Sequence, residues 1–260
     1  MEKKLKKNSF IQGTLIASFA LIFIKVLGAL YVIPFYKIVG EDGGTLYSYA
    51  YSIYNLFLNI STAGIPVAMS MIISEYLSLE MYDAKERSYK VGRYMVCILA
   101  IVSFCLVFFG SDFLARFILS NKVDGHSIKD VSLVIKSISF CLLIIPFLSI
   151  LRGYLQGHKY ISSTSVAQVI EQVVRILIVI LGSFVSIKIY KSSIPLGVSV
   201  ALSGTFFGGL FAYIYLKGKI SSNKKAFPVS DKRNNISNMT LAKKILTYCI
   251  PLVIIAVTDN

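Results

Sequence analysis

Residues 165–182 read SVAQVIEQVVRILIVILG and lie inside a longer apolar run, 163–187. A run of this length predicts an α-helix that crosses the roughly 30 Å of bilayer hydrocarbon. The run nevertheless contains two ionisable residues, Glu171 and Arg175. Such groups cost a few kcal/mol each near the bilayer centre, and they persist where they face a protein interior or a water-filled cavity. This helix therefore predicts both a membrane fold and a polar site inside it.

The four-residue spacing of Glu171 and Arg175 places them on one face of the predicted helix, with Gln168 and Gln172 beside them. Two interpretations are open. In the first, these four residues line a transport path and contact the substrate. In the second, Glu171 and Arg175 neutralise each other and fix this helix to its neighbours.

The composition of the whole chain is that of a membrane protein. Hydrophobic residues make up 55%, charged residues 15%, and the mean hydropathy is +0.70. We predict an all-α integral membrane protein, a polytopic helical bundle with six complete spans at 9–36, 47–74, 93–115, 131–151, 163–187 and 194–216. A seventh span begins near Ile245 and reaches Asn260 after about fifteen residues, fewer than a crossing requires. We therefore expect a piece of a longer protein or a truncated gene product.

Lysine and arginine are unevenly distributed between the predicted spans. Eighteen lie on the side of the N-terminus, six on the other side, and three within spans. The positive-inside rule then predicts a cytoplasmic N-terminus in a bacterial cell membrane. This topology explains most of the net charge of +14, so a nucleic-acid partner is not expected.

Loop composition suggests the domain organisation. Residues 1–216 form a six-helix lobe, 217–244 a flexible cytoplasmic connection rich in Lys, Ser and Asn, and 245–260 the start of a second lobe. Residues 75–92 alternate in charge and predict a short cytoplasmic helix. Within the second span, Gly64 and Pro66 predict a kink, because proline lacks a backbone donor and clashes with the preceding turn.

Several kinds of chemistry are not predicted. The chain has no phosphate-binding G-x-x-x-x-G-K-[ST] loop. Its two histidines, His126 and His158, lie on opposite sides of the predicted membrane and cannot share a zinc ion. We expect no catalytic residues, no metal and no cofactor. Gly204 and Gly208 are spaced for close helix contact, and packing within the chain is favoured over dimerisation.

Lys25 lies near the middle of the first predicted span, too deep to reach either membrane surface easily. Together with Arg175 it would make a cationic cavity suited to an anionic substrate. If Glu171 neutralises Arg175, only the charge of Lys25 remains.

Two long segments carry a family resemblance. The first begins at Lys25-Val-Leu-Gly-Ala-Leu-Tyr31 and continues through Ser61-Thr-Ala-Gly-Ile-Pro-Val-Ala68 to Glu75. The second is Arg152-Gly-Tyr-Leu-Gln-Gly157, followed by Gln168-Val-Ile-Glu-Gln172 and Arg175. Together they resemble the stage V sporulation protein B family of polysaccharide biosynthesis and export proteins. That family belongs to the multidrug/oligosaccharidyl-lipid/polysaccharide flippase superfamily, to which the lipid II flippases also belong.

The resemblance implies one six-helix lobe of a two-lobe, MATE-like fold with a central cavity. It implies movement of an undecaprenyl-pyrophosphate-linked oligosaccharide or peptidoglycan precursor by alternating access, with membrane lipids and a coupling ion as further partners. The chain departs from the family's usual residues at Val32, Met71 and Ser163, and the first two remove cations. The alternatives are a drug or cation antiporter of the same superfamily and a non-transporting scaffold or decayed fragment.

Overall fold

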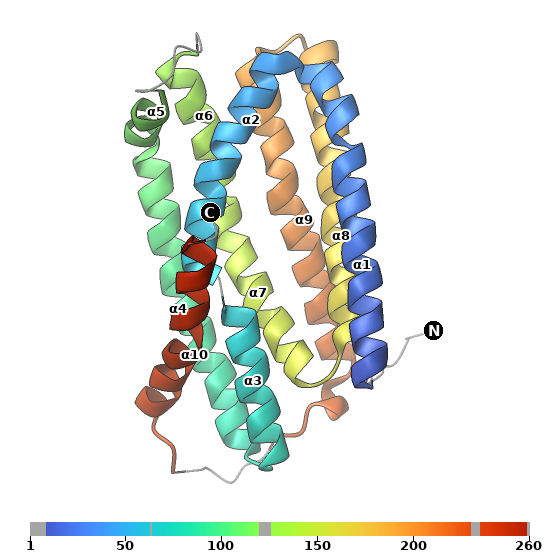
Figure 1. The fold of residues 1–260 in the computed structure, drawn as a ribbon, viewed down its shortest axis with the longest axis vertical. Coiled ribbons are helices and arrows are strands. Elements are labelled where there is room, and N and C mark those ends of the chain that lie inside the picture. The colour runs from blue at the N-terminus through green and yellow to red at the C-terminus, as the bar shows by residue number, and fades with distance from the viewer. Residues whose placement is uncertain (1–8, 63, 120–125, 230–234, 259–260) are drawn as a thin grey trace.

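The structure, a computed structural model, describes residues 9–62, 64–119, 126–229 and 235–258, and these contain helices and no strand (Figure 1). The α-helices are α1 (Phe10–Leu30), α2 (Val32–Thr62), α3 (Ile65–Ser78), α4 (Tyr82–Phe109), α5 (Ser111–Leu119), α6 (Ile128–Ser139), α7 (Cys141–Gly157), α8 (Ile161–Leu177), α9 (Ile194–Ser222) and α10 (Asn238–Thr258). Two π-helical turns, η1 (Ile178–Gly182) and η2 (Val185–Ile189), extend α8, and a 3₁₀ turn, η3 (Lys224–Ala226), follows α9.

The described residues contain six stretches long and apolar enough to cross a membrane. Two of them consist of a pair of helices in line, α2 with α3 (Val32–Ser78) and α6 with α7 (Ile128–Gly157). The other four are Ile11–Leu30, Tyr82–Phe109, Ile161–Ile189 and Ile194–Ser222. Each corresponds to one predicted span, so the all-α, multi-pass membrane fold is confirmed.

The predicted kink in the second span is a complete break between two helices. Gly64 adopts φ +79°, a left-handed conformation that glycine tolerates at no steric cost, and α3 starts directly after it. Pro66 lies in the first turn of α3, where its missing N–H would have no helical partner anyway. A second glycine with positive φ, Gly40 at +72°, bends α2 near its beginning.

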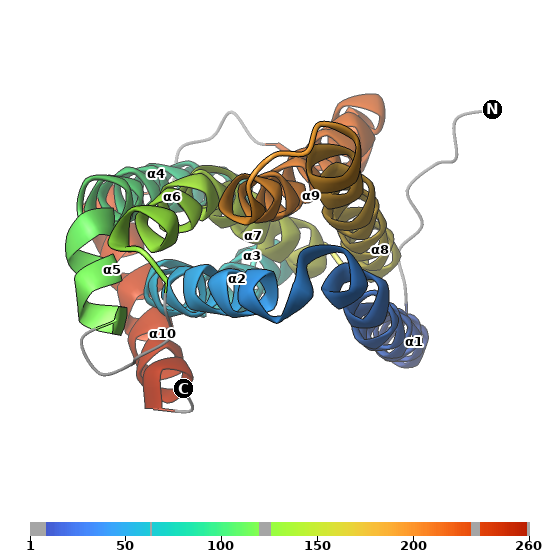
Figure 2. The ribbon, with the colours of Figure 1, turned by 90° about the horizontal axis from the view of Figure 1, so that it is seen from above.

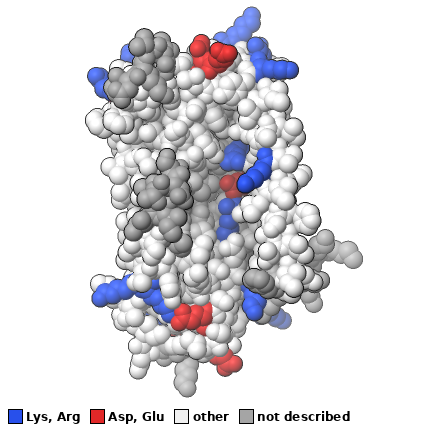
Figure 3. Space-filling view, viewed as in Figure 1, with Lys and Arg blue, Asp and Glu red and all other residues white. Residues whose placement is uncertain are grey.

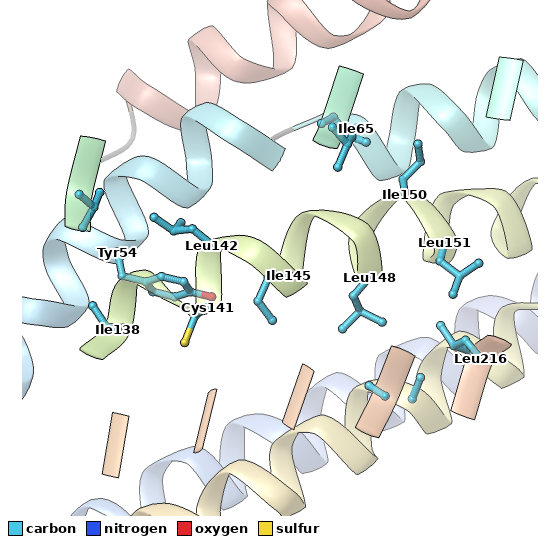
Figure 4. Packing of buried hydrophobic residues seen from close by; sticks show 14 of the residues in the cluster. Tyr54, Ile65, Ile138, Cys141, Leu142, Ile145, Leu148, Ile150, Leu151 and Leu216 are labelled. Atoms are coloured by element: carbon cyan, nitrogen blue, oxygen red, sulfur yellow. The ribbon is translucent and has the colours of Figure 1, made fainter. Parts of the chain in front are cut away.

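The core of the bundle is built around α7. Viewed from above, α7 lies between α4, α6 and α9 on one side and α2 on the other (Figure 2). Its buried side chains pack against those of α2, α3 and α9, as the close-up of the apolar cluster shows (Figure 4). Those of α7 labelled there are Cys141, Leu142, Ile145, Leu148, Ile150 and Leu151.

The predicted short helix at 75–92 does not exist as a separate element. Residues 82–92 are the first turns of α4, which continues without interruption to Phe109. The reason is packing. Lys85, although charged, is fully buried, and its Nζ donates to the carbonyl oxygen of Pro228 at 2.6 Å and pairs with Glu86 at 3.0 Å.

The predicted flexible connection at 217–244 is largely structured among its described residues. α9 extends to Ser222 and α10 already begins at Asn238. Between them Phe227 is only 7% exposed and contacts the rings of Tyr154, His158 and Tyr160. Arg87 on α4 donates to the carbonyl oxygen of Ile236 at 2.6 Å. We call residues 224–238 the strap, because its described parts are fastened across the ends of α4 and α7.

The strap lies at the same end of the bundle as the start of α1 and the turns α3–α4 and α7–α8 (Figure 1). The bend of α2 at Gly40 and the link from η2 to α9 lie at the opposite end. The described parts of the Lys- and Arg-rich segments that the sequence grouped on one side are thus at one end of the molecule.

Candidate functional site

One face of the bundle is hollowed, and charged atoms of both signs lie inside the hollow (Figure 3). We call it the groove. Four charged residues lie within the membrane-spanning stretches of three helices that pack together: α1 carries Lys25, α7 carries Arg152, and α8 carries Glu171 and Arg175. The excess is cationic, with three basic side chains and one acidic side chain among these four.

Glu171 pairs with Arg152 and not with Arg175. The Nη2 atom of Arg152 donates to Oε2 of Glu171, which joins α7 to α8. The two side chains are only 14% and 16% exposed, so water screens this pair far less than a surface pair. The predicted self-neutralising pair within one helix is therefore wrong. Arg152, which the sequence placed in a loop just beyond the span, is the true partner, because α7 continues to Gly157.

Arg175 forms a different set of contacts. Its Nη2 atom donates to Oε1 of Gln172, one turn earlier on α8, and its Nη1 atom donates to the hydroxyl of Tyr51 on α2 at 3.2 Å. Tyr51 in turn stacks on Tyr47, with ring centroids 5.6 Å apart and planes 12° from parallel. Both partners of Arg175 are neutral, so its positive charge is not cancelled by them. Its buried Nε atom has no hydrogen-bond partner among the described residues.

Lys25 lies on the exposed surface of α1, where it forms no hydrogen bond or ion pair with any residue that the structure describes. Because α1 and α8 run side by side, the contacts between them show which turn of α8 lies beside Lys25. A Cβ atom added to Gly13 would touch Ile161, and one added to Gly28 would lie 3.5 Å from Nε2 of Gln172. Lys25 is one turn before Gly28, so it stands level with the α8 turn that carries Gln168 and Glu171.

The predicted site residues thus fall into two groups. Glu171, Gln172 and Arg175 lie together on α8 beside α7, Gln168 is half-buried one turn below them, and Lys25 stands at their level on α1, which packs along α8 without pairing with them. The break at Gly64 and Pro66 lies elsewhere, against α7. A Cβ atom on Gly153 would stand 2.5 Å from the carbonyl oxygen of Pro66, so that glycine lets α7 approach the start of α3.

The sequence analysis did not identify two residues of this site, Arg152 and Tyr51. Both occur in the segments that carried the family resemblance, which was the available signal. Helical spacing could not identify them, because they reach Glu171 and Arg175 from other helices. Among the described residues no group of three or more His, Cys, Asp or Glu side chains could hold a metal ion.

The comparisons with known proteins agree with this architecture. The family model for polysaccharide biosynthesis proteins matches residues 10–258. The lipid II flippase MurJ of Bacillus subtilis (strain 168) is 31% identical over 253 residues, which is 95% of this chain and 46% of the relative. Stage V sporulation protein B of the same organism is 26% identical over 81% of this chain and 39% of its own length. The chain thus spans about half the length of the curated relatives it matches.

Solved structures show the same fold. A MOP superfamily transporter from Pyrococcus furiosus superposes with a TM-score of 0.77 at 14% identity, over 99% of this chain and 56% of that one. An outward-facing multidrug resistance transporter of the MATE family gives 0.72 at 13% identity, again over 99% and 56%. The match of the family model over nearly the whole chain settles its membership: the chain belongs to the polysaccharide biosynthesis protein family.

Proposed function

We propose that this chain is the N-terminal lobe of a membrane transporter that flips a lipid-linked anionic sugar across the bacterial cytoplasmic membrane by alternating access. The substrate class is an undecaprenyl-pyrophosphate-linked oligosaccharide or peptidoglycan precursor. One relative, MurJ of Bacillus subtilis, is named a lipid II flippase and so belongs to this functional class. Transport and not catalysis is therefore the activity we propose, with residues 217–244 connecting to a second lobe and the N-terminus in the cytoplasm.

The observation that carries the proposal is the charge of the groove. The guanidinium groups of Arg152 and Arg175 can bind phosphate oxygens with two parallel hydrogen bonds. Lys25 adds a point charge that forms no ion pair with any described residue. With Glu171 as the single acid among these four residues, the set carries a net charge of about +2 at neutral pH. A pyrophosphate group complements such a site. A cationic drug does not, which favours this function over the antiporter.

The test uses the complete product of the gene that encodes this chain, expressed in a bacterium depleted of its own lipid II flippase. Restored growth and translocation of lipid-linked precursor would support the proposal. A second arm measures binding of farnesyl pyrophosphate, a short prenyl pyrophosphate, to the purified protein in lipid nanodiscs. Failure of both arms with well-expressed protein would reject it. Binding or export of cationic drugs instead would support the antiporter.

A further inference from the structure

We infer that the phenol hydroxyls of Tyr31 and Tyr47 bind the sugar of the substrate, next to the cations that bind its pyrophosphate. The inference rests on the proposed function and deepens it, because it assigns the uncharged part of the substrate to a subsite of its own within the groove. Tyr31 caps the end of α1, and Tyr47 and Tyr51 lie one turn apart on α2. We call these three residues the tyrosine row.

The tyrosine row adjoins Arg175. The hydroxyl of Tyr51 accepts a hydrogen bond from Nη1 of Arg175 at 3.2 Å, and the ring of Tyr51 stacks on that of Tyr47. The hydroxyl of Tyr31 lies within hydrogen-bonding reach of the Tyr47 hydroxyl, so it joins the row from the side of α1. Arg175 interacts electrostatically with all three phenols. A cation whose hydrogen-bond partners are neutral therefore borders a cluster of uncharged donors and acceptors.

The depth of these phenols indicates polar surroundings. Tyr47 and Tyr51 belong to the membrane-spanning stretch Val32–Ser78. At the α-helical rise they lie roughly 10 and 16 Å along α2 from the bend at Gly40. Tyrosine is usually enriched at membrane interfaces, and a hydroxyl in hydrocarbon costs free energy unless it finds a partner. Tyr54, the next tyrosine on this face, is 3% exposed and belongs to the core, whereas the tyrosine row is only partly buried.

The chemistry of a phenol suits a sugar. Its hydroxyl both donates and accepts hydrogen bonds, as the hydroxyl groups of a sugar ring require, and its aromatic ring offers apolar surface to the C–H bonds of that ring. Tyr51 accepts from Arg175 and donates to no described residue, so its proton is available to a ligand. A site for phosphate alone would gain more from further lysine or arginine side chains than from phenols.

The groups along the groove follow the same order as the groups of the substrate. α8 runs from the strap end of the bundle towards the bend at Gly40, so Arg175 lies one turn closer to that bend than the ion pair of Glu171. α2 runs the opposite way, and Tyr47 lies one turn closer to the bend than Tyr51. Towards the bend, the groove thus presents the ion pair, then Arg175, then the phenols. In a lipid-linked sugar the pyrophosphate likewise joins the lipid on one side and the sugar on the other.

The experiment compares two probes, farnesyl pyrophosphate and the same molecule with one N-acetylglucosamine on its terminal phosphate. Their binding to the complete gene product in lipid nanodiscs is measured for the natural protein, Tyr47→Phe, Tyr31→Phe and Tyr94→Phe. Phenylalanine keeps the ring and removes only the hydroxyl, so the packing is preserved. Tyr94 lies on α4 and is 67% exposed, so its variant is the matched control. The difference in charge between the probes cancels when each variant is compared with the natural protein.

Tyr47→Phe and Tyr31→Phe should each weaken binding of the sugar-bearing probe by about 3- to 10-fold, the equivalent of one hydrogen bond between neutral groups. Binding of farnesyl pyrophosphate should stay unchanged in both, which also shows that the variants are folded. Tyr94→Phe should bind both probes as the natural protein does. Tyr51→Phe should weaken both probes, because Tyr51 also holds Arg175.

The ratio of the two affinities decides the outcome. If this ratio is the same in Tyr47→Phe or in Tyr31→Phe as in the natural protein, the inference is overturned and the proposed function stands. Loss of farnesyl pyrophosphate binding by the Tyr47 variant would overturn it too, since the hydroxyl would then serve the pyrophosphate and not the sugar. If the natural protein binds neither probe, the proposed function fails together with the inference.

Discussion

A Cβ atom at Gly208 would stand 2.6 Å from the backbone carbonyl oxygen of Glu171, closer than real side chains approach. One turn earlier, a Cβ atom at Gly204 would stand 2.8 Å from the carbonyl oxygen of Arg175. The two glycines of α9 therefore lie directly behind the turn of α8 that carries the charges of the groove. Helix packing within the chain, and not dimerisation, accounts for their spacing.

The first prediction concerns this contact. Gly208→Ala should lower the free energy of unfolding by about 1–3 kcal/mol, because the new methyl group meets backbone that cannot rotate away. Unfolding of the purified protein in detergent measures the change. Gly218→Ala is the matched control, since nothing lies within 4 Å of a Cβ atom there. Equal stability of the two variants would contradict the close packing of α9 on α8.

The second prediction tests the ion pair between Arg152 and Glu171. Removing one partner of a buried pair leaves an uncompensated charge and typically costs about 3–5 kcal/mol. Arg152→Gln and Glu171→Gln should each approach this range, reduced by the residual exposure of both side chains. The double variant should be milder than the sum of the single ones.

The control for this comparison of single and double variants is the pair that the sequence first suggested, Glu171 with Arg175. Glu171→Gln combined with Arg175→Gln should show a smaller coupling energy than Glu171 with Arg152, because the hydrogen bonds of Arg175 go to Gln172 and Tyr51 instead. A strong coupling energy for Glu171 with Arg175, together with none for Glu171 with Arg152, would show that the acid pairs within its own helix.

The third prediction concerns Lys25. Lys25→Ala should leave the protein inserted and abundant, since it removes an exposed charge that forms no hydrogen bond or ion pair with any described residue. Translocation of lipid-linked sugar by the complete gene product should nonetheless be largely lost. Lys25→Arg should keep part of this activity, because arginine also binds phosphate, and only part, because its geometry differs from that of lysine. Lys188→Ala, an exposed lysine at the end of η2, is the control and should transport normally. Normal transport by a well-expressed Lys25→Ala protein contradicts the role of Lys25 in the groove.

The fourth prediction concerns the strap. Phe227→Ala should loosen the described part of the strap at 224–229, because truncating a buried phenylalanine typically costs about 3–5 kcal/mol. Limited proteolysis between α9 and α10 should become faster while the spans stay protected. Val229→Ala is the control, since that side chain is 69% exposed. Unchanged cleavage of the Phe227 variant would mean that the aromatic contacts with Tyr154 and Tyr160 do not hold the strap.

The fifth prediction is the orientation of the chain. In a background where Cys97, Cys105, Cys141 and Cys249 are replaced, Lys129→Cys should react with a membrane-impermeant reagent added to intact cells, whereas Lys225→Cys should react only after the cells are opened. Both positions are exposed at opposite ends of the bundle. Labelling of position 225 from outside would reverse the topology.

The sequence by itself determined the number and order of the spans, the membrane class and the polar face of α8. These properties depend on the length of apolar runs and on helical spacing, which are local. It also indicated the break near Gly64 and Pro66, since glycine and proline act on the backbone where they stand. It did not show that proline would begin a new helix, which depends on α7 packing against that point.

Only the tertiary structure decided which charges pair. Glu171 has Arg175 one turn away in its own helix, but the guanidinium of Arg152 reaches it from α7, and Arg175 turns to Tyr51 on α2. The strap likewise looked flexible by composition, yet Phe227 and the carbonyl oxygens of Pro228 and Ile236 find partners on α4 and α7. Partners distant in sequence are set by how helices assemble, because a buried charge or ring takes whichever partner the packing brings within reach.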